Sequence, residues 1–588
     1  MAISAPWRSI SFDHISDLKG FWAQRLQVVT RTTAQLCLDK CEATGRLANF
    51  RRAAGREEGG FQGIYFNDSD VYKILEGIAY LLADQPDEAL AHQAEAIIDD
   101  ICAAQWEDGY INTYYSLTDR SQRWTDMGMH EDYCIGHMIE AAIAYYHATG
   151  RDKWLRCAVR AAEHMMSLFG PGLRHWVVGH QGLELALVKL SEVTGRTDFL
   201  DFARWLVEER GHGHLDAASF RQQGLDSVYC QDDLPASQLR RVTGHAVRAM
   251  YYYSAMSDLA ALQDDQALRE AVLSLHRNTV PANMYVTGGI GQDSRHEGFT
   301  RDYHLPNLTA YCETCAAIGM AMWHQRLNLL EGEGSYADIV ELELYNGALA
   351  GLSLSGDLFF YDNPLASVGK TRRRPWFDCS CCPTNLMRFL PSVAGYAYAQ
   401  RGDSLMINQY IAGTLSLGEG SQATRLVVQT DYPWDGRVSI SLEQAGGLSE
   451  LRLRIPGWCE HWQVNGKQLE SHQGYVSLPL NSGLVYELTL DMPVRRLRQD
   501  ERVQETAGRV AFARGPIVYC AEEMDYPGYV REYFHADVRA PKKEPRLVPG
   551  QGVLEGMHLL QFEEGRLIPY FAWNNRDQAA MAVWLKED

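Results

Sequence analysis

The sequence lacks a basic surface, because 55 lysines and arginines stand against 75 aspartates and glutamates, a formal net charge of −20. This balance excludes a nucleic-acid partner, which needs a positively charged face. No run of 18 or more residues is free of charge and polarity, so we expect no membrane-spanning helix. The N-terminal segment MAISAPWRSISFDHISDL also lacks the apolar core of a signal peptide.

The sequence also lacks the even number of cysteines that a complete set of disulfides would need. The 13 cysteines are odd in number and scattered from Cys37 to Cys520, which argues against a disulfide framework. A reducing cytoplasm is therefore the expected compartment. The chain has 588 residues, of which 46% are hydrophobic, and this is enough for two to four globular domains.

The first part of the chain, up to about residue 390, has the pattern of paired helices. Segments 139–150, 183–195 and 246–262 carry apolar residues at helical spacing, and each is followed by a second helical segment. Pairs that recur about every 50–60 residues indicate a helical repeat. About six such pairs can close into an (α/α)6 barrel, with the more apolar helix of each pair on the inside.

The pattern changes to short alternating strands after Arg401, separated by Gly, Pro, Asn and Asp. A further group of strands begins at Arg509. The fold class that we predict is a multidomain α and β protein, an (α/α)6 barrel catalytic domain followed by β-sandwich domains. The predicted domains are residues 1–400, with the first few residues joining the sandwich, then a β-sandwich at 401–505 and a second, smaller one at 506–588.

The strongest local signal is FDCSCCPTN, with Cys379, Cys381 and Cys382. Thiolates this close repel one another unless a soft cation neutralises them. The segment YCETC adds Glu313 and Cys315, so the two segments together offer a zinc site. Residues two apart do not share a helix face, so we expect this second segment to be irregular or at a helix start. From spacing alone, a closed structural zinc site, a catalytic site and a cluster without metal all stay open.

Two further patterns add candidate residues. TGGIGQDSRHEGF places Glu297 in a glycine-rich loop, 16 residues before Glu313, where a carboxylic acid can reach into a cleft. Four histidines lie at or near expected helix starts, where neutral imidazoles can hydrogen-bond sugar hydroxyls. They are His130, His137, His180 and His245.

The sequence resembles glycoside hydrolase family 127, the β-L-arabinofuranosidase family. The resemblance rests on YCETCAAIG, CSCCPTN, TGGIG…HEGF, FNDSDVYKILEG, EDGYINTYY, VELELYNGALAG, FFYDNPL and LRIPGW, which extend over nearly the whole chain. It implies an (α/α)6 catalytic barrel with attached β-sandwiches and an oligosaccharide or other small glycoside as substrate. It also implies a homodimer through the β domains.

The resemblance also implies roles for individual residues. Zinc would be held by Glu313, Cys315, Cys381 and Cys382, with Cys381 as the nucleophile and Glu297 as the acid/base. The implied sugar-binding residues are His130, His180, His245, Glu341 and Tyr361, with Gln35 as a looser candidate. Tyr65 and Asp68 lie in a matching segment without a defined role, and Cys379 is expected to be a neighbouring or packing residue.

The implied reaction is retaining hydrolysis in two displacements, releasing β-L-arabinofuranose or a closely related sugar. Two other classes stay open. One is a different sugar enzyme on the same barrel, such as an epimerase, a lyase or an unsaturated-uronide hydrolase, which does not need the cysteine cluster. The other is a non-catalytic sugar-binding protein with a structural zinc.

Overall fold

The computed structural model describes residues 6–587. The first five residues of the segment examined for a signal peptide, and the last residue of the predicted third domain, lie outside the described residues. The chain divides into two compact units. One comprises Val29–Asn278 and Trp376–Ser392, and the other comprises Met1–Val28, Thr279–Pro375 and Val393–Asp588. None of the described helices has the length and apolar character that a membrane span requires.

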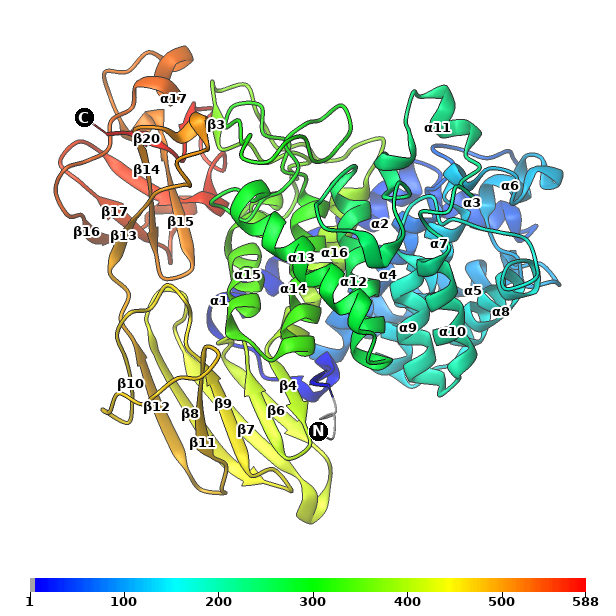
Figure 1. The fold of residues 1–588 in the computed structure, drawn as a ribbon, viewed down its shortest axis with the longest axis horizontal. Coiled ribbons are helices and arrows are strands. Elements are labelled where there is room, and N and C mark those ends of the chain that lie inside the picture. Colours follow the sequence, from blue (N-terminus) through cyan, green and yellow to red (C-terminus); the bar gives the residue numbers. More distant parts are fainter. Residues whose placement is uncertain (1–5, 588) are drawn as a thin grey trace. The chain divides into compact units, whose positions relative to one another are not determined.

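The first unit is built from helix pairs, as the repeat predicts (Figure 1). Helices α4, α7, α9 and α12 are successive neighbours, and α16 packs against α4. Helices α5, α8 and α10 each pack against the preceding helix of their pair. The bounds are α4 Asp68–Asp84, α5 Glu88–Ala104, α7 Glu131–Thr149, α8 Lys153–Leu168, α9 Leu183–Thr194, α10 Thr197–Glu208, α12 Ala246–Leu262, α13 Gln266–Asn283 and α16 Cys381–Phe389. Shorter helices are α2 Ala34–Ala43, α3 Arg46–Ala53, α6 Thr113–Leu117 and α11 Ala218–Gln222.

Burial distinguishes the two helices of a pair. Every residue of α7 from Glu131 to Tyr145 is buried, whereas α8 buries one face and exposes the other. A helix that is buried all round belongs to the interior, and an amphipathic helix covers it. The prediction that the more apolar helix of each pair is the inner one is therefore confirmed for this pair. Gly150 and Gly195 end α7 and α9 with φ of +70° and +68°, a left-handed backbone that suits glycine.

The second unit contains α1 (Gly20–Val28), α14 (Thr314–Glu331), α15 (Gly334–Leu342) and three β-sheets. Two sheets have the strand orders β1-β4-β5-β9-β11 and β10-β12-β8-β7-β6-β2. Strands such as β8 and β12 alternate buried and exposed residues, which is the pattern of a β-sandwich. The bounds are β1 Arg8–Ser9, β2 Ile15–Ser16, β4 Tyr398–Arg401, β5 Ser404–Ile407, β6 Gly413–Leu417, β7 Thr424–Thr430, β8 Arg437–Ala445, β9 Glu450–Arg454, β10 Trp462–Val464, β11 Tyr475–Pro479 and β12 Val485–Leu490.

The third sheet contains the strands near the C-terminus, drawn in orange and red in Figure 1. Its main path is β13-β14-β15-β18-β17-β16, and β19 pairs with both β15 and β3. The N-terminal strands β1 and β2 pair with β4 and β6 of the other two sheets. The bounds are β3 Ala366–Ser367, β13 Val494–Leu497, β14 Arg509–Arg514, β15 Ile517–Glu522, β16 Arg546–Pro549, β17 His558–Gln561, β18 Arg566–Pro569, β19 Met581–Ala582 and β20 Leu585–Lys586.

Candidate active site

The segment Tyr-Cys-Glu-Thr-Cys leads directly into helix α14, as expected. Glu313 is the residue before the helix and Cys315 is in its first turn. The Cys312 backbone has a left-handed φ of +41° and donates its N–H to the carbonyl of Gly291 at 2.9 Å. The Thr314 N–H donates to the carbonyl of Tyr361, also at 2.9 Å. These bonds fix the turn that presents Glu313 and Cys315.

The Cys-Ser-Cys-Cys segment ends at the start of helix α16, whose first two residues are Cys381 and Cys382. Their Sγ atoms are 3.9 Å apart. This is far from the S–S bond length of about 2.05 Å, and all 13 cysteines are free thiols. Two sulfurs on one tetrahedral zinc lie about 3.8 Å apart, given zinc–sulfur bonds of about 2.3 Å. The spacing of these two sulfurs therefore suits a shared cation.

A buried ion pair holds this cysteine segment in place. The Arg46 Nε lies 2.9 Å from the Oδ2 of Asp70, and both side chains are almost fully buried. Arg46 also donates to the carbonyl of Asp378 at 2.8 Å, and the hydroxyl of Thr384 donates to Asp70 at 3.1 Å. The pair thus binds the chain on both sides of Cys381.

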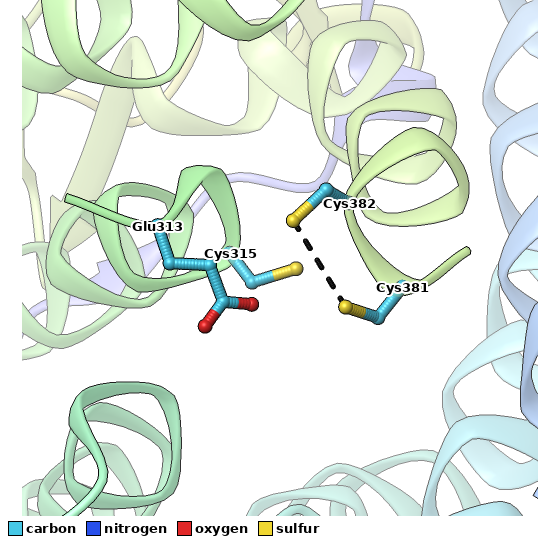
Figure 2. A group of neighbouring side chains, drawn as sticks. All are labelled: Glu313, Cys315, Cys381 and Cys382. Carbon is cyan, nitrogen blue, oxygen red and sulfur yellow. Dashed lines mark hydrogen bonds between the residues drawn. The ribbon is translucent and has the colours of Figure 1, made fainter. Parts of the chain in front are cut away.

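Four of the predicted residues form one group of ligand atoms. Glu313, Cys315, Cys381 and Cys382 each offer one such atom, and these atoms all lie within 4.8 Å of one another (Figure 2). Three thiols with one carboxylate are a donor set that fits a soft or borderline cation. The group could therefore hold a metal ion.

The helices that carry these residues add a favourable field. Glu313 and Cys315 lie at the N-terminus of α14, while Cys381 and Cys382 are the first residues of α16. The N-terminal end of a helix carries a partial positive charge and favours anions. Thiolates and a carboxylate at these positions are therefore stabilised by the backbone itself.

Glu297 lies on a short loop, as the sequence indicates. The loop is closed by hydrogen bonds between Asp293 and Gly298, and Glu297 has a left-handed φ of +50°. The Tyr311 hydroxyl donates to the Oε1 of Glu297 at 3.1 Å. Ligand atoms of Glu297 and Glu313 lie within 4.8 Å of each other. A strained non-glycine residue beside such a group is typical of a functional position.

Three predicted histidines follow one another in space. The ring centroids of His130 and His180 are 5.4 Å apart, and those of His180 and His245 are 5.7 Å apart. His130 precedes α7, His245 precedes α12, and His180 lies three residues before α9. Tyr133 packs against the ring of His180 at 4.3 Å and accepts a hydrogen bond from Lys73 at 2.7 Å.

The backbone sets the tautomers of these rings. The Nδ1 atoms of His130 and His180 face the carbonyls of Gly128 and Gln181 at 2.8 and 2.9 Å. A carbonyl only accepts, so each Nδ1 carries the proton, and in the neutral ring Nε2 is an acceptor. Burial lowers the pKa of His180 well below its usual value, which keeps this ring neutral. His245 is the opposite case, because its Nδ1 accepts from the Val247 N–H at 3.1 Å and Nε2 then carries the proton.

The remaining predicted residues lie in different surroundings. Tyr361 is half-buried next to the start of α14, with its ring 6.3 Å from that of Tyr311. Glu341 is buried, and its carboxylate binds Arg454 and Tyr432 at 2.5 Å and the Trp458 indole at 2.9 Å. The two oxygens of Glu341 therefore bind strand β9 through Arg454 and the nearby residues Tyr432 and Trp458.

Gln35 is the looser candidate, and its sugar-binding role stays a prediction. It lies on the exposed face of α2 and donates to Asp39 at 2.7 Å on the same helix. The expectation of a sugar-binding role came from a poorly matching segment, which did not show which face of the helix Gln35 occupies. His137 also differs from expectation, because it is buried in the interior of α7 rather than at a helix start.

Sequence reasoning missed the residues that support the site. Arg46, Asp70 and Tyr311 were not singled out, although Asp70 lies within the matching segment FNDSDVYKILEG. Asp68, which lies in the same segment, accepts from the Thr113 hydroxyl and N–H. Cys379 is half-buried and lies outside the group of four ligand residues. Buried charged residues in a helix such as α4 are the signal that could have found Asp70.

Known proteins match nearly the whole chain. Three family models match, and they are described as "Beta-L-arabinofuranosidase, GH127 catalytic domain" at residues 15–395, "GH127 middle domain" at 404–494 and "Glycoside hydrolase family 127 C-terminal domain" at 494–586. A non-reducing end β-L-arabinofuranosidase of Bifidobacterium longum subsp. longum is 35% identical over 92% of both chains.

Solved structures agree. A GH127 β-L-arabinofuranosidase from Geobacillus stearothermophilus T6 has 34% identity and a TM-score of 0.89, covering 98% of this chain and 100% of that chain. Another GH127 β-arabinofuranosidase has 35% identity and a TM-score of 0.89, covering 100% and 98%. The fold class is therefore confirmed, an (α/α)6-type helical domain followed by β-sheet domains, and the protein is a glycoside hydrolase. The chain belongs to glycoside hydrolase family 127.

Proposed function

We propose that this enzyme releases β-L-arabinofuranose, or a closely related sugar, from the non-reducing end of oligosaccharides or glycoconjugates, with retention of configuration. The observation that carries the proposal is the group formed by Glu313, Cys315, Cys381 and Cys382. The names of the relatives from Bifidobacterium longum and Geobacillus stearothermophilus support the choice of sugar.

We propose zinc as the ion of this group. Glu313, Cys315, Cys381 and Cys382 would hold it, and three thiolates with one carboxylate complete a tetrahedral set. When bound, zinc keeps the Cys381 sulfur as a thiolate and stabilises the same sulfur as a leaving group.

Cys381 and Glu297 supply the reacting groups. In the first displacement the Cys381 sulfur attacks the anomeric carbon, while the Glu297 carboxylic acid gives its proton to the glycosidic oxygen, so a C–S bond replaces the C–O bond. In the second, the Glu297 carboxylate takes a proton from water, the water oxygen attacks the anomeric carbon, and the C–S bond breaks. Two inversions at one carbon restore the original configuration.

The histidines and Tyr361 orient the sugar in this proposal. The Nε2 atoms of neutral His130 and His180 accept hydrogen bonds from hydroxyls, whereas the protonated Nε2 of His245 donates one. Two acceptors and one donor at fixed positions select a sugar by the positions of its hydroxyls and not by charge. Such contacts hold the anomeric carbon at the cysteine without changing during the reaction.

The proposal is tested with an aryl β-L-arabinofuranoside and two matched cysteine variants. We expect Cys381→Ser to fold normally and to lose kcat by at least about 10³-fold, because an alcohol is a much weaker nucleophile than a thiolate. Cys379→Ser, two residues away and outside the ligand group, should keep wild-type kcat. Full activity of Cys381→Ser would remove the nucleophile assignment.

The same assay tests Glu297. With a good leaving group the first displacement needs little acid assistance, so Glu297→Gln should accumulate the cysteine-linked sugar. Added azide needs no general base and should restore turnover, giving a β-arabinofuranosyl azide that is identified by NMR. Unimpaired hydrolysis by Glu297→Gln, or an α-azide as product, would contradict the acid/base role.

A further inference from the structure

A second cluster of metal-ligating side chains lies apart from the cysteine group. His175, Glu209 and His214 each offer one ligand atom, and these atoms lie within 4.8 Å of one another. The Nδ1 of His175 is 2.5 Å from the Oε1 of Glu209, and the Nδ1 of His214 contacts the same oxygen. The two imidazole centroids are 3.9 Å apart. Two rings therefore point the same nitrogen at one carboxylate oxygen.

The local sequence builds this cluster from two fixed segments. Glu209 follows the last residue of α10, and the next residues are Arg-Gly-His-Gly-His. Gly211 has a φ of +79°, and a Cβ there would lie 2.1 Å from the Leu234 carbonyl carbon, so only glycine fits the turn. The buried Arg210 donates to the carbonyls of Val178 and Cys230. Because Val178 is three residues after His175, this arginine fixes both sides of the cluster.

Electrostatics favours a cation at this point. The Glu209 carboxylate lies at the C-terminal end of α10, where the helix carries a partial negative charge. Its side chain is only 9% exposed. Within residues 6–587, it forms ion pairs with His175 and His214. A divalent ion held by the two imidazoles would balance the charge of this buried carboxylate.

Access from solvent is also present. The side chain of His175 is 62% exposed and that of His214 is 34% exposed, so an ion can enter and leave without opening the core. Metal–nitrogen and metal–oxygen bonds of about 2.0–2.2 Å set neighbouring ligand atoms about 3.3 Å apart. The exposed histidines would need to move outward by roughly 1 Å to reach this spacing.

We propose that His175, Glu209 and His214 form a second metal site, which takes a borderline divalent ion such as Ni²⁺, Zn²⁺ or Cu²⁺. Two imidazoles and one carboxylate suit these ions, and water completes the coordination. The ion links the segment before α9, which carries His180 five residues after His175, to the turn that follows α10. It stabilises that connection and takes no part in glycoside cleavage.

The test uses the enzyme as purified, with its own metal content unchanged, and Ni²⁺ as the probe. We expect isothermal titration calorimetry to show one Ni²⁺ per chain and the unfolding temperature to rise with Ni²⁺ concentration. His175→Gln and His214→Gln should each weaken Ni²⁺ binding by at least about tenfold and remove the shift. Both substitutions are at partly exposed side chains, so folding is not at risk.

His212→Gln is the matched control. Its ring lies 6.3 Å from that of His214, in the same turn but outside the ligand group. We expect this variant to bind Ni²⁺ as the wild type does, and all three variants to keep glycosidase activity. Failure of the wild type to bind Ni²⁺, or equal weakening by His212→Gln, would overturn the site. Ni²⁺ binding and the unfolding temperature do not depend on turnover, so the test of this site is independent of the proposed reaction.

Discussion

The two groups of this protein that could hold a metal ion are opposite in construction. The cysteine group places three thiols and a carboxylate at the N-termini of α14 and α16, where the helix ends favour anionic ligands. The histidine group places one carboxylate after the C-terminus of α10, where the helix end disfavours it, and adds two imidazoles. The first is suited to retain a soft ion, and the second to exchange a borderline one.

Their surroundings differ in the same direction. Glu313, Cys315 and Cys382 are buried. The buried Arg46–Asp70 ion pair binds the chain on both sides of Cys381. The histidine group is open to solvent on the side of His175. Burial and helix polarity, rather than the number of candidate ligands, therefore distinguish the group that we propose for the reaction from the group that we propose to link two segments.

Metal removal should give the largest difference between the two groups. We expect enzyme stripped of metal to lose kcat by about 10³-fold, since a bound ion stabilises transition-state charge by several kcal/mol. One equivalent of Zn²⁺ should restore it. In the His175→Gln, His214→Gln double variant the loss and the recovery should be the same, and full activity of the stripped wild type would contradict the comparison.

Cobalt shows which group is occupied in that experiment. Co²⁺ bound by thiolates should give strong sulfur-to-cobalt absorption in the near ultraviolet, whereas imidazole and carboxylate ligands give none. The band should appear with the first equivalent and return together with activity. A stripped enzyme that regains activity without the band would place the essential ion elsewhere.

The buried ion pair behind the cysteine group gives the next largest effect. Arg46→Met removes one partner of a buried ion pair and leaves Asp70 without it, so the free energy of unfolding in urea should fall by about 3–5 kcal/mol. Arg51→Met is the control from the same helix, because the Arg51 ion pairs with Glu42 and Glu57 are partly exposed, and it should cost about 1 kcal/mol or less. Equal effects of the two variants would show that the buried pair does not support the site.

The sequence was sufficient for the features that are local. Helical and strand periods depend on neighbouring residues, so the paired helices and the strands after residue 401 could be predicted. The four residues that could hold a metal could be singled out for the same reason, because Glu313 and Cys315, like Cys381 and Cys382, are close together along the chain and lie at helix starts.

Contacts between distant residues could not be predicted. Thr384 binds Asp70 across 314 positions, and Arg454 binds Glu341 across 113, so no pattern within one segment reveals either pair. His175 and Glu209 are 34 positions apart and were missed for the same reason. The exposed position of Gln35 could not be predicted either, since a loose match along the sequence does not establish which way a side chain on a helix points.

The smallest effect that we predict on activity distinguishes two histidines of the segment before α9, His175 and His180. His180 is buried within the row of histidines, and the Nε2 of its neutral ring can accept a hydrogen bond, whereas His175 contacts Glu209 near the surface. We expect His180→Gln to lower kcat/KM on an aryl β-L-arabinofuranoside about tenfold, or ~1.4 kcal/mol, which is the value of one lost hydrogen bond to a sugar hydroxyl. His175→Gln should leave kcat/KM unchanged and weaken only Ni²⁺ binding. If His175→Gln lowered kcat/KM as much as His180→Gln, the two histidines would serve one site. The proposed division between a reacting site and a separate metal site that links two segments would then be wrong.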